Sequence, residues 1–460
     1  MDQKNRNSAN SLIIPRLNAF LEAMRALRSL QEFVQENLRT LAAVEDDYVL
    51  QGKRLYPSVD PSIHRAVADF LHPQIHLRMS RAKSIKNSGG GPKQLDKMRK
   101  SWAENVRMGI LAITNDPDYL PKSSHIWDQC GRSPLKTRLL RNSLLMGAVS
   151  DFEVLVSGLV RAFLTLRPEI LRSSDQKYSF ADLQPFSTIE EFQEHCIENM
   201  AEVLLRGGFD DWMEWFGKKR NIKVPGVTED AGALVEIFQR RHLLVHNGGV
   251  VNKFYLSKVS GPELPVLGDR LHVGTQYLEN SVDELTVAGV KLSFSLLQKM
   301  APNEVDLEEL SHRLEHLSFD LLSAGYFRPV FSLNDWHLGF VKDSERRLIV
   351  MVNKWIAMKK MGLAERVCIE VAEWDTATLS GTYRLAKLAL IDDNAAAYSL
   401  VKAMISAGEL RRESWRDWPL LEGVREFELK NIGSADKIWV VAFGGEHTHP
   451  NTEDGRNAEA

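Results

Sequence analysis

The chain has 460 residues, enough for two or three domains with a sizeable hydrophobic core. Its hydrophobic fraction of 44% and its charged fraction of 26% are those of an ordinary soluble protein. The formal net charge of -3 excludes a globally basic nucleic-acid binder, although it is compatible with a local basic groove.

The cysteines and the apolar runs predict a soluble cytoplasmic protein. Cys130, Cys196 and Cys368 lie far apart and form no C-x-x-C pair, so we expect neither a metal cluster nor a disulfide framework. The polar N-terminus lacks the apolar region of a signal peptide. No uninterrupted apolar run approaches the roughly 20 residues that cross a bilayer, so we expect no membrane partner.

The N-terminal region, residues 1–125, is predicted to be helical. A second helical stretch, Ile63–Arg81, follows a turn-rich passage and is expected to break or kink at Pro73. The first helix is long and amphipathic, because apolar residues recur in it mostly at a spacing of three: Leu17, Phe20, Leu21, Met24, Leu27, Leu30, Phe33 and Leu38.

The glycine-rich segment Ser88–Pro92 has the composition most typical of a flexible connection between helices in this chain. Two interpretations remain open: a solvated loop between helices, or an arm that touches a phosphate backbone. The second follows from the basic residues on both sides, which are Arg78, Arg81, Lys83, Lys86, Lys93, Lys97, Arg99 and Lys100.

A central region, residues 130–300, contains the strongest helical pattern. Further helices are expected at 186–205, 210–216, 231–246 and 282–300, and in the first of these Ser187 and Glu190 form a predicted capping box. The stretch Leu139–Leu171 is apolar along one broad stripe, formed by Leu145, Val149, Phe152, Val156, Leu159, Val160 and Phe163.

A C-terminal region, residues 305–430, is predicted to be a set of short helices. It resembles a stack of helix pairs of the tetratricopeptide type only loosely, because no fixed period is evident. Residues 431–460 form a tail that is expected to be disordered, apart from a candidate strand at Lys437–Phe443. The predicted helices are 307–322, 344–361, 364–374, 381–390 and 394–407.

One stretch carries chemistry: residues 239–256, Q-R-R-H-L-L-V-H-N-G-G-V-V-N-K-F-Y-L. Arg241 and His246 lie near the end of a predicted helix, and the pair Gly248 and Gly249 is expected to stop it. An arginine supplies a fixed positive charge for a phosphate, and a histidine moves protons near neutral pH. Cleavage of a phosphodiester in RNA requires both functions.

Arg241 and His246 are five positions apart, which places them about 140° from each other around a straight helix. One helix can hardly direct both at the same phosphate. Two explanations remain open: the helix ends or bends between Val245 and Gly248, or the two groups come from different subunits.

The central region resembles the HEPN domain family of small helical bundles, which contains many ribonucleases of toxin and defence systems. Arg241, His242 and His246 match the family's motif of an arginine, a polar residue and a histidine. The following Asn247, Gly249 and Val251 resemble a variant close to R-x-x-x-V-H-N-x-G-x-V. Asp151, Phe152 and Glu153 look like part of the family's first core helix.

The resemblance implies a metal-independent endoribonuclease without cofactor that acts as a homodimer, with a toxin or an anti-phage effector as the expected role. His246 would move the proton of the 2′-hydroxyl or of the leaving 5′-oxygen, and Arg241 would hold the phosphate, with His242 and Asn247 as supporting donors. Arg240 and Lys253 are expected to contact RNA. The expected partners are RNA, with tRNA as one candidate, a second copy of the chain, and an antitoxin or another protein.

Plainer interpretations of the same residues stay open. In one, His246 only complements the negative end of a helix dipole, and one of Arg240 and Arg241 forms a structural ion pair, for instance with Glu153. In another, the whole domain is a non-catalytic dimerisation or partner-binding module. His242 and His246 have the spacing of half a zinc site, but no third ligand is evident, so no metal is expected.

Overall fold

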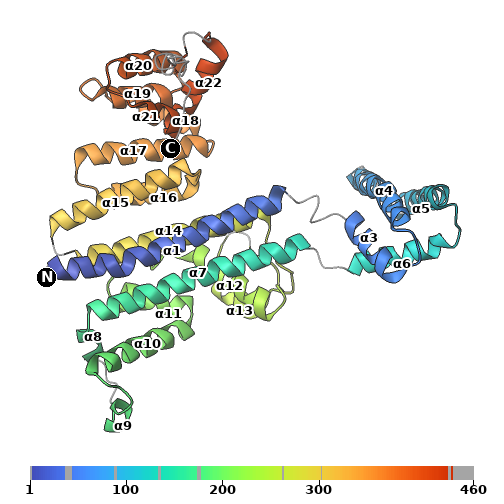
Figure 1. Cartoon of the computed structure of the whole chain (residues 1–460), viewed down its shortest axis with the longest axis horizontal. Helices are drawn as coiled ribbons and strands as arrows, with labels where there is room; N and C mark the ends of the chain where they lie inside the picture. Colours follow the sequence, from blue (N-terminus) through green and yellow to red (C-terminus); the bar gives the residue numbers. More distant parts are fainter. Residues whose placement is uncertain are drawn as a thin grey trace, which may run out of the picture. The chain divides into compact units, whose positions relative to one another are not determined.

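The structure is a computed structural model that describes residues 3–36, 44–87, 91–132, 136–172, 178–261, 264–301, 303–433 and 437–438. Within these ranges the regular structure is helical, and the only β-type pairings are the isolated bridges Pro225–Glu229 and Val250–Arg270. The predicted mostly α class is therefore confirmed (Figure 1).

The chain divides into two compact units. The first comprises residues 1–17, 155–231 and 286–460, and the second comprises residues 18–154 and 232–285. The predicted regions 1–125, 130–300 and 305–430 remain predictions. Three long helices contribute residues to both units: α1 (Gln3–Glu36), α7 (Lys136–Leu166) and α14 (Thr275–Met300).

Helix α7 supplies core to both units. All seven residues of its predicted apolar stripe are buried, none of them more than 4% exposed. In the second unit the ring of Phe152 packs edge-on against Phe20 and Phe238, at centroid distances of 6.1 and 5.9 Å. Among the described helices, α7 alone is long and apolar enough to cross a membrane, and 44% of its most apolar window is buried in the structure. A core helix passes the same test, so this is weak support for a membrane span.

Helix α1 follows the predicted amphipathic pattern over only part of its length. Leu17, Phe20 and Met24 are buried, whereas Leu30 and Phe33 are more than half exposed. The helix continues through Pro15 without ending.

Four helices of the second unit pack into a small bundle. Its core includes Tyr48, Val67, Ile110 and Ile126. Of the break or kink expected at Pro73, the break is wrong, because one helix runs through that residue. The four helices are α3 (Val44–Leu55), α4 (Pro61–Asn87), α5 (Pro92–Thr114) and α6 (Tyr119–Arg132).

The first unit contains the helices that come directly after α7 in the chain, up to residue 231. Helix α10 begins one residue later than its predicted capping box implies. Thr188, with extended backbone, caps the helix by accepting a hydrogen bond from the Glu191 amide. The amide of Ser187 donates to the Glu191 carboxylate at 2.8 Å. The elements are α8 (Glu169–Arg172), α9 (Phe180–Leu183), α10 (Ile189–Gly207), α11 (Phe209–Glu214) and the π-helical turn η1 (Trp215–Lys219).

The C-terminal helices of the first unit stack in successive pairs (Figure 1). The five predicted helices are present, and three more were not predicted. The additional helices are α16 (Phe327–Leu338), α21 (Arg412–Asp417) and α22 (Glu422–Asn431). The short turn η2 (Pro419–Leu421) lies between α21 and α22. The predicted helices are α15 (Glu304–Ser323), α17 (Ser344–Lys360), α18 (Ala364–Ala372), α19 (Gly381–Leu390) and α20 (Asn394–Ser406). The candidate strand at 437–443 and the tail lie almost wholly outside the described residues.

Candidate functional site

The motif lies on α12 (Gly232–His246) in the second unit, and two glycines end this helix. Gly248 and Gly249 adopt positive φ angles of 58° and 82°, which glycine tolerates without a steric cost. The amide of Gly249 donates to the carbonyl of Leu243 at 2.9 Å, six residues back, as in a glycine-terminated helix. The predicted stop at the glycine pair is confirmed.

The chain after the glycines is held by a short backbone clasp. Val251 exchanges hydrogen bonds with Asp269 and Gly268 at 2.8 and 3.0 Å, and the amide of Leu271 donates to Gly249 at 2.9 Å. A Cβ atom on Gly249 would lie 3.0 Å from the Leu271 carbonyl, so this close approach requires glycine. The clasp fixes where the helix end lies relative to α13 (Lys253–Lys258).

Arg240 belongs to a half-buried polar cluster around Glu236. The Glu236 carboxylate accepts hydrogen bonds from Arg240 at 2.7 Å, from Tyr255 at 2.7 Å and from Tyr277 at 2.6 Å. The Arg240 guanidinium lies 3.8 Å from the centre of the Tyr277 ring and donates to the carbonyl of His272. Burial alone would lower the pKa of Arg240, but its neighbours outweigh burial and raise it.

These partners give Arg240 a structural role. Its side chain is 16% exposed and its donors are engaged within the fold. The expectation that Arg240 contacts RNA therefore has no support from its surroundings, and it does not enter the proposal below.

Arg241 forms an ion pair with Glu153 of α7, as one of the plainer interpretations anticipated. The two side chains are 25% and 31% exposed, so the guanidinium is still reachable from solvent. Burial raises the pKa of Glu153, and the positive charge of Arg241 only partly offsets this.

His242 and His246 lie together on the exposed side of α12. Their ring centroids are 4.6 Å apart, and the His242 ring lies 6.1 Å from that of Phe254 on α13. Burial, followed by the charges of His246 and Arg241, lowers the pKa of His242. His242 therefore remains neutral, and able to accept a proton, to a lower pH than an ordinary histidine.

Asn247 and Lys253 complete the predicted set. The Asn247 side chain donates to the carbonyl of Val250 at 2.6 Å and so stabilises the turn that follows the helix. Lys253 is exposed at the start of α13, next to Phe254.

Arg241 and His246 do not converge within one chain. Helix α12 ends at His246, within the interval that the first of the two explanations named, and five helical positions place the two side chains about 140° apart around its axis. Arg241 faces α7 through Glu153, whereas His242, whose ring lies beside that of His246, faces α13 through Phe254. Phe254 was not predicted as a site residue, and in the sequence only its place directly after the polar residues Asn252 and Lys253 hints at exposure.

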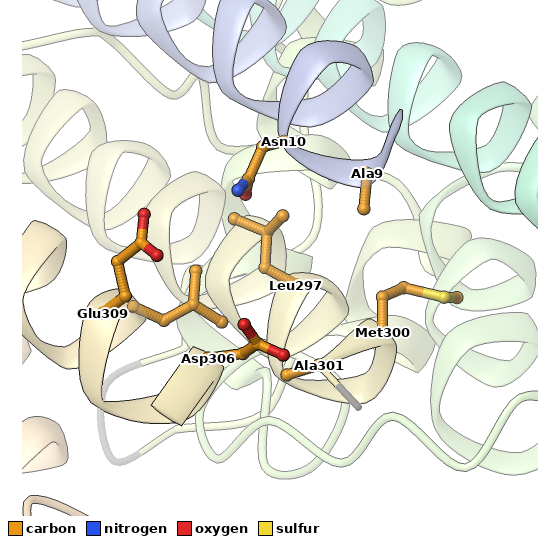
Figure 2. Close-up of a pocket in the computed structure, with 8 residues that line it drawn as sticks. Ala9, Asn10, Leu297, Met300, Ala301, Asp306 and Glu309 are labelled. Carbon is orange, nitrogen blue, oxygen red and sulfur yellow. The ribbon is translucent and has the colours of Figure 1, made fainter. Parts of the chain in front are cut away.

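The described residues of the first unit line a small cavity and a larger one. One, of about 20 Å³, is lined by Asn10, Leu297, Asp306 and Glu309 among others, and has room for about one water molecule (Figure 2). The other, of about 270 Å³, lies where α15 meets the turn before α17. Two cations that line it are paired with carboxylates, Lys342 with Glu304 and Arg346 with Glu315.

No group of three or more histidine, cysteine, aspartate or glutamate side chains converges as metal ligands in the described part of the chain. Comparisons with protein-family models, with curated proteins and with solved structures found no match to this chain.

Proposed function

We propose that the chain is a metal-independent endoribonuclease of HEPN type, a toxin or anti-phage effector, whose reactive groups are His242, His246 and Arg241. The observation that carries the proposal is the exposed imidazole pair at the end of α12, with ring centroids 4.6 Å apart, on a helix that also carries a solvent-reachable arginine. Two adjacent imidazoles can provide a proton acceptor and a proton donor in one site.

The chemistry follows from these groups. A neutral imidazole takes the proton of the RNA 2′-hydroxyl, and the oxygen attacks the adjacent phosphorus. The bond from phosphorus to the 5′-oxygen breaks, and an imidazolium protonates that oxygen. The products are a 2′,3′-cyclic phosphate and a 5′-hydroxyl. The lowered pKa of His242 suits it to accept the first proton.

Arg241 would stabilise the negative charge that develops on the phosphate, because a guanidinium presents paired donors to phosphate oxygens. Since Arg241 and His246 diverge on one helix, we propose that the arginine of one copy serves the histidines of a second copy. A two-fold axis near α12 would bring them together.

Apolar side chains next to the motif support such pairing. Val154 follows Glu153 and is 70% exposed, while Val245 and Phe254 on α12 and α13 are 49% and 53% exposed. Their burial between two copies would remove apolar surface from water.

The same apolar face also supports a second candidate function, a dimerisation or partner-binding module without catalysis. The ion pair between Arg241 and Glu153 favours this alternative, because it engages part of the guanidinium. In that case RNA would remain intact and the substitution His246→Ala would leave the assembly unchanged.

The test is incubation of tRNA and total RNA with purified protein in EDTA, followed by analysis of the product ends. We expect 2′,3′-cyclic phosphate ends from the wild type and at least a 100-fold lower rate from His246→Ala. A matched control exists in α15, where His312 and His316 form another exposed pair with ring centroids 4.3 Å apart. His316→Ala should cleave normally, and loss of activity in both variants, or in neither, would contradict the proposal.

A further inference from the structure

The hairpin formed by α4 and α5 concentrates positive charge at one end. Residues 74–103 contain eight lysines and arginines and a single acidic residue, Asp96, in a chain whose net charge is -3. The two helices pack against each other, so residues on both sides of their connection are brought together. A charge imbalance of this kind is the electrostatic footprint of a polyanionic partner.

The exposed cations are separated from the hairpin core. Leu95, Met98 and Trp102 are the less exposed positions of this part of α5, and the indole of Trp102 donates to the carbonyl of Gln74 on α4 at 2.9 Å. Arg78 of α4 lies over the Trp102 ring, 4.6 Å from its centre. The packing therefore anchors the two helices and leaves the other side chains of α5 between Lys93 and Ala103 in solvent.

Three lysines form a stripe on the exposed side of α5. Lys93, Lys97 and Lys100 follow at intervals of four and three residues, which places them on one helix face over about 10 Å. Lys100 pairs with Asp96 at 3.0 Å, but both side chains are more than half exposed and such pairs are weak. Arg81 and Arg99 are exposed as well.

We infer that this basic hairpin surface, defined by Arg78, Arg81, Lys93, Lys97, Arg99 and Lys100, binds the phosphate backbone of RNA. The identity of the polyanion rests on the proposed function. The composition of α5 favours a nucleic acid over a lipid surface: from Lys93 to Ser101 every exposed side chain is polar or charged, and Leu77 of α4 is the one large apolar side chain exposed among the described residues of this end of the hairpin. A membrane-binding helix needs apolar side chains beside its cations.

The surface binds without regard to sequence, because lysine and arginine contacts to phosphates carry no base information. It retains the RNA, while the imidazole pair of α12 acts on the scissile linkage. Removal of the hairpin charge is therefore expected to weaken binding of long RNA and to leave the chemical step intact.

The experiment measures binding of a fluorescein-labelled single-stranded RNA to the full chain carrying His246→Ala, in EDTA, over a range of salt concentrations. The test variant adds Lys93→Gln, Lys97→Gln and Lys100→Gln. The control adds Lys218→Gln, Lys219→Gln and Lys223→Gln, which remove the same charge from exposed positions elsewhere. Circular dichroism verifies that both are folded.

We expect the hairpin variant to bind RNA more weakly and to reduce the slope of log affinity against log salt by about 2, since each single-strand phosphate contact contributes about 0.7. The control variant should bind RNA with the same affinity and salt dependence as the His246→Ala protein. Equal binding by both variants would overturn the inference. The inference would also be overturned if the hairpin variant lost binding to phosphatidylserine vesicles but kept its binding to RNA, because the surface would then be a membrane-binding surface.

Cleavage is measured separately, in chains with His246 intact and with a short RNA at saturating concentration. The hairpin variant should retain kcat. If the wild type binds RNA through the hairpin but cleaves nothing, the proposed function fails and the hairpin inference stands. If the hairpin variant binds RNA as tightly as the wild type and cleaves it normally, the hairpin inference fails and the proposed function stands.

Discussion

Arg241 and Glu153 form an ion pair although they are 88 residues apart in the sequence. The pair joins the motif helix α12 to the core helix α7 and fixes the direction in which the Arg241 side chain extends. Neighbouring Arg240 extends elsewhere, into the cluster around Glu236. Two adjacent arginines therefore have different surroundings: Arg240 stabilises a polar cluster of the fold, and Arg241 remains partly accessible to solvent.

Replacement of Glu153 by glutamine tests the electrostatics of this pair. Burial raises the pKa of Glu153. Its protonated form is thus favoured by folding, and the stability that it contributes is lost as pH rises through its raised pKa. We expect Glu153→Gln to melt at or above the wild-type temperature at pH 7, and the difference to vanish below the ordinary pKa of 4.5. A lower melting temperature at pH 7 would show that the ion pair outweighs burial.

Substitution of each arginine by alanine should separate their roles. Arg240→Ala leaves the half-buried Glu236 carboxylate without its cation and should lower the free energy of unfolding by about 3 kcal/mol. Arg241→Ala should cost about 1 kcal/mol or less, because its pair is more exposed. Chemical denaturation measures both values, and equal losses would refute the distinction.

The glycine at the helix end is expected to be indispensable. Gly249→Ala forces a side chain into a positive φ and against the Leu271 carbonyl, so the free energy of unfolding should fall by roughly 1–3 kcal/mol. Gly232→Ala, at the start of the same helix, has open space around its Cβ and should be neutral or stabilising by up to about 1 kcal/mol. Similar effects of the two substitutions would contradict the close approach.

A buried histidine in the first unit should make stability depend on pH. Burial, with a contribution from Arg346, lowers the pKa of His337 to about 4. The unfolded chain protonates this histidine near pH 6.5, so the stability that the neutral form provides is present above 6.5 and is lost as pH falls toward 4.

The change corresponds to roughly 3 kcal/mol over that interval. Because Ser311 contacts Nε2 of His337 at 2.6 Å, His337→Gln keeps a polar group there. Denaturation at pH 7 and pH 5 should show a smaller difference for His337→Gln than for the wild type. An unchanged difference would assign the effect to other groups.

Much of this architecture could be predicted from the spacing of apolar residues and from the glycines and cap residues at helix ends. The stripe of α7 is apolar at helical spacing and is buried as expected, and the glycine pair after His246 ends α12. The start of α10 was misplaced by one residue, because Ser187 and Thr188 are both good caps and only the backbone conformation selects between them.

The site was harder to predict because its contacts are distant in sequence. Arg240 and Glu236 have the spacing of a helical ion pair, but Tyr277, which completes their cluster, lies 41 residues from Glu236. The hydrophobic pattern also could not show that Leu30 and Phe33 are exposed, since periodicity identifies a face and not its partner. Helix α16 contains Pro329, Asn334 and His337 at buried positions, which obscure its apolar pattern.

The central claim is that Arg241 and the imidazole pair act on one phosphate from two copies of the chain. Its most direct test is RNA cleavage by a mixture of inactive Arg241→Ala and His246→Ala proteins, unfolded and refolded together. Half of the dimers would then contain one intact composite site, so the mixture should recover about a quarter of wild-type activity. A mixture as inactive as its components, beside an active wild type refolded in the same way, would contradict the claim.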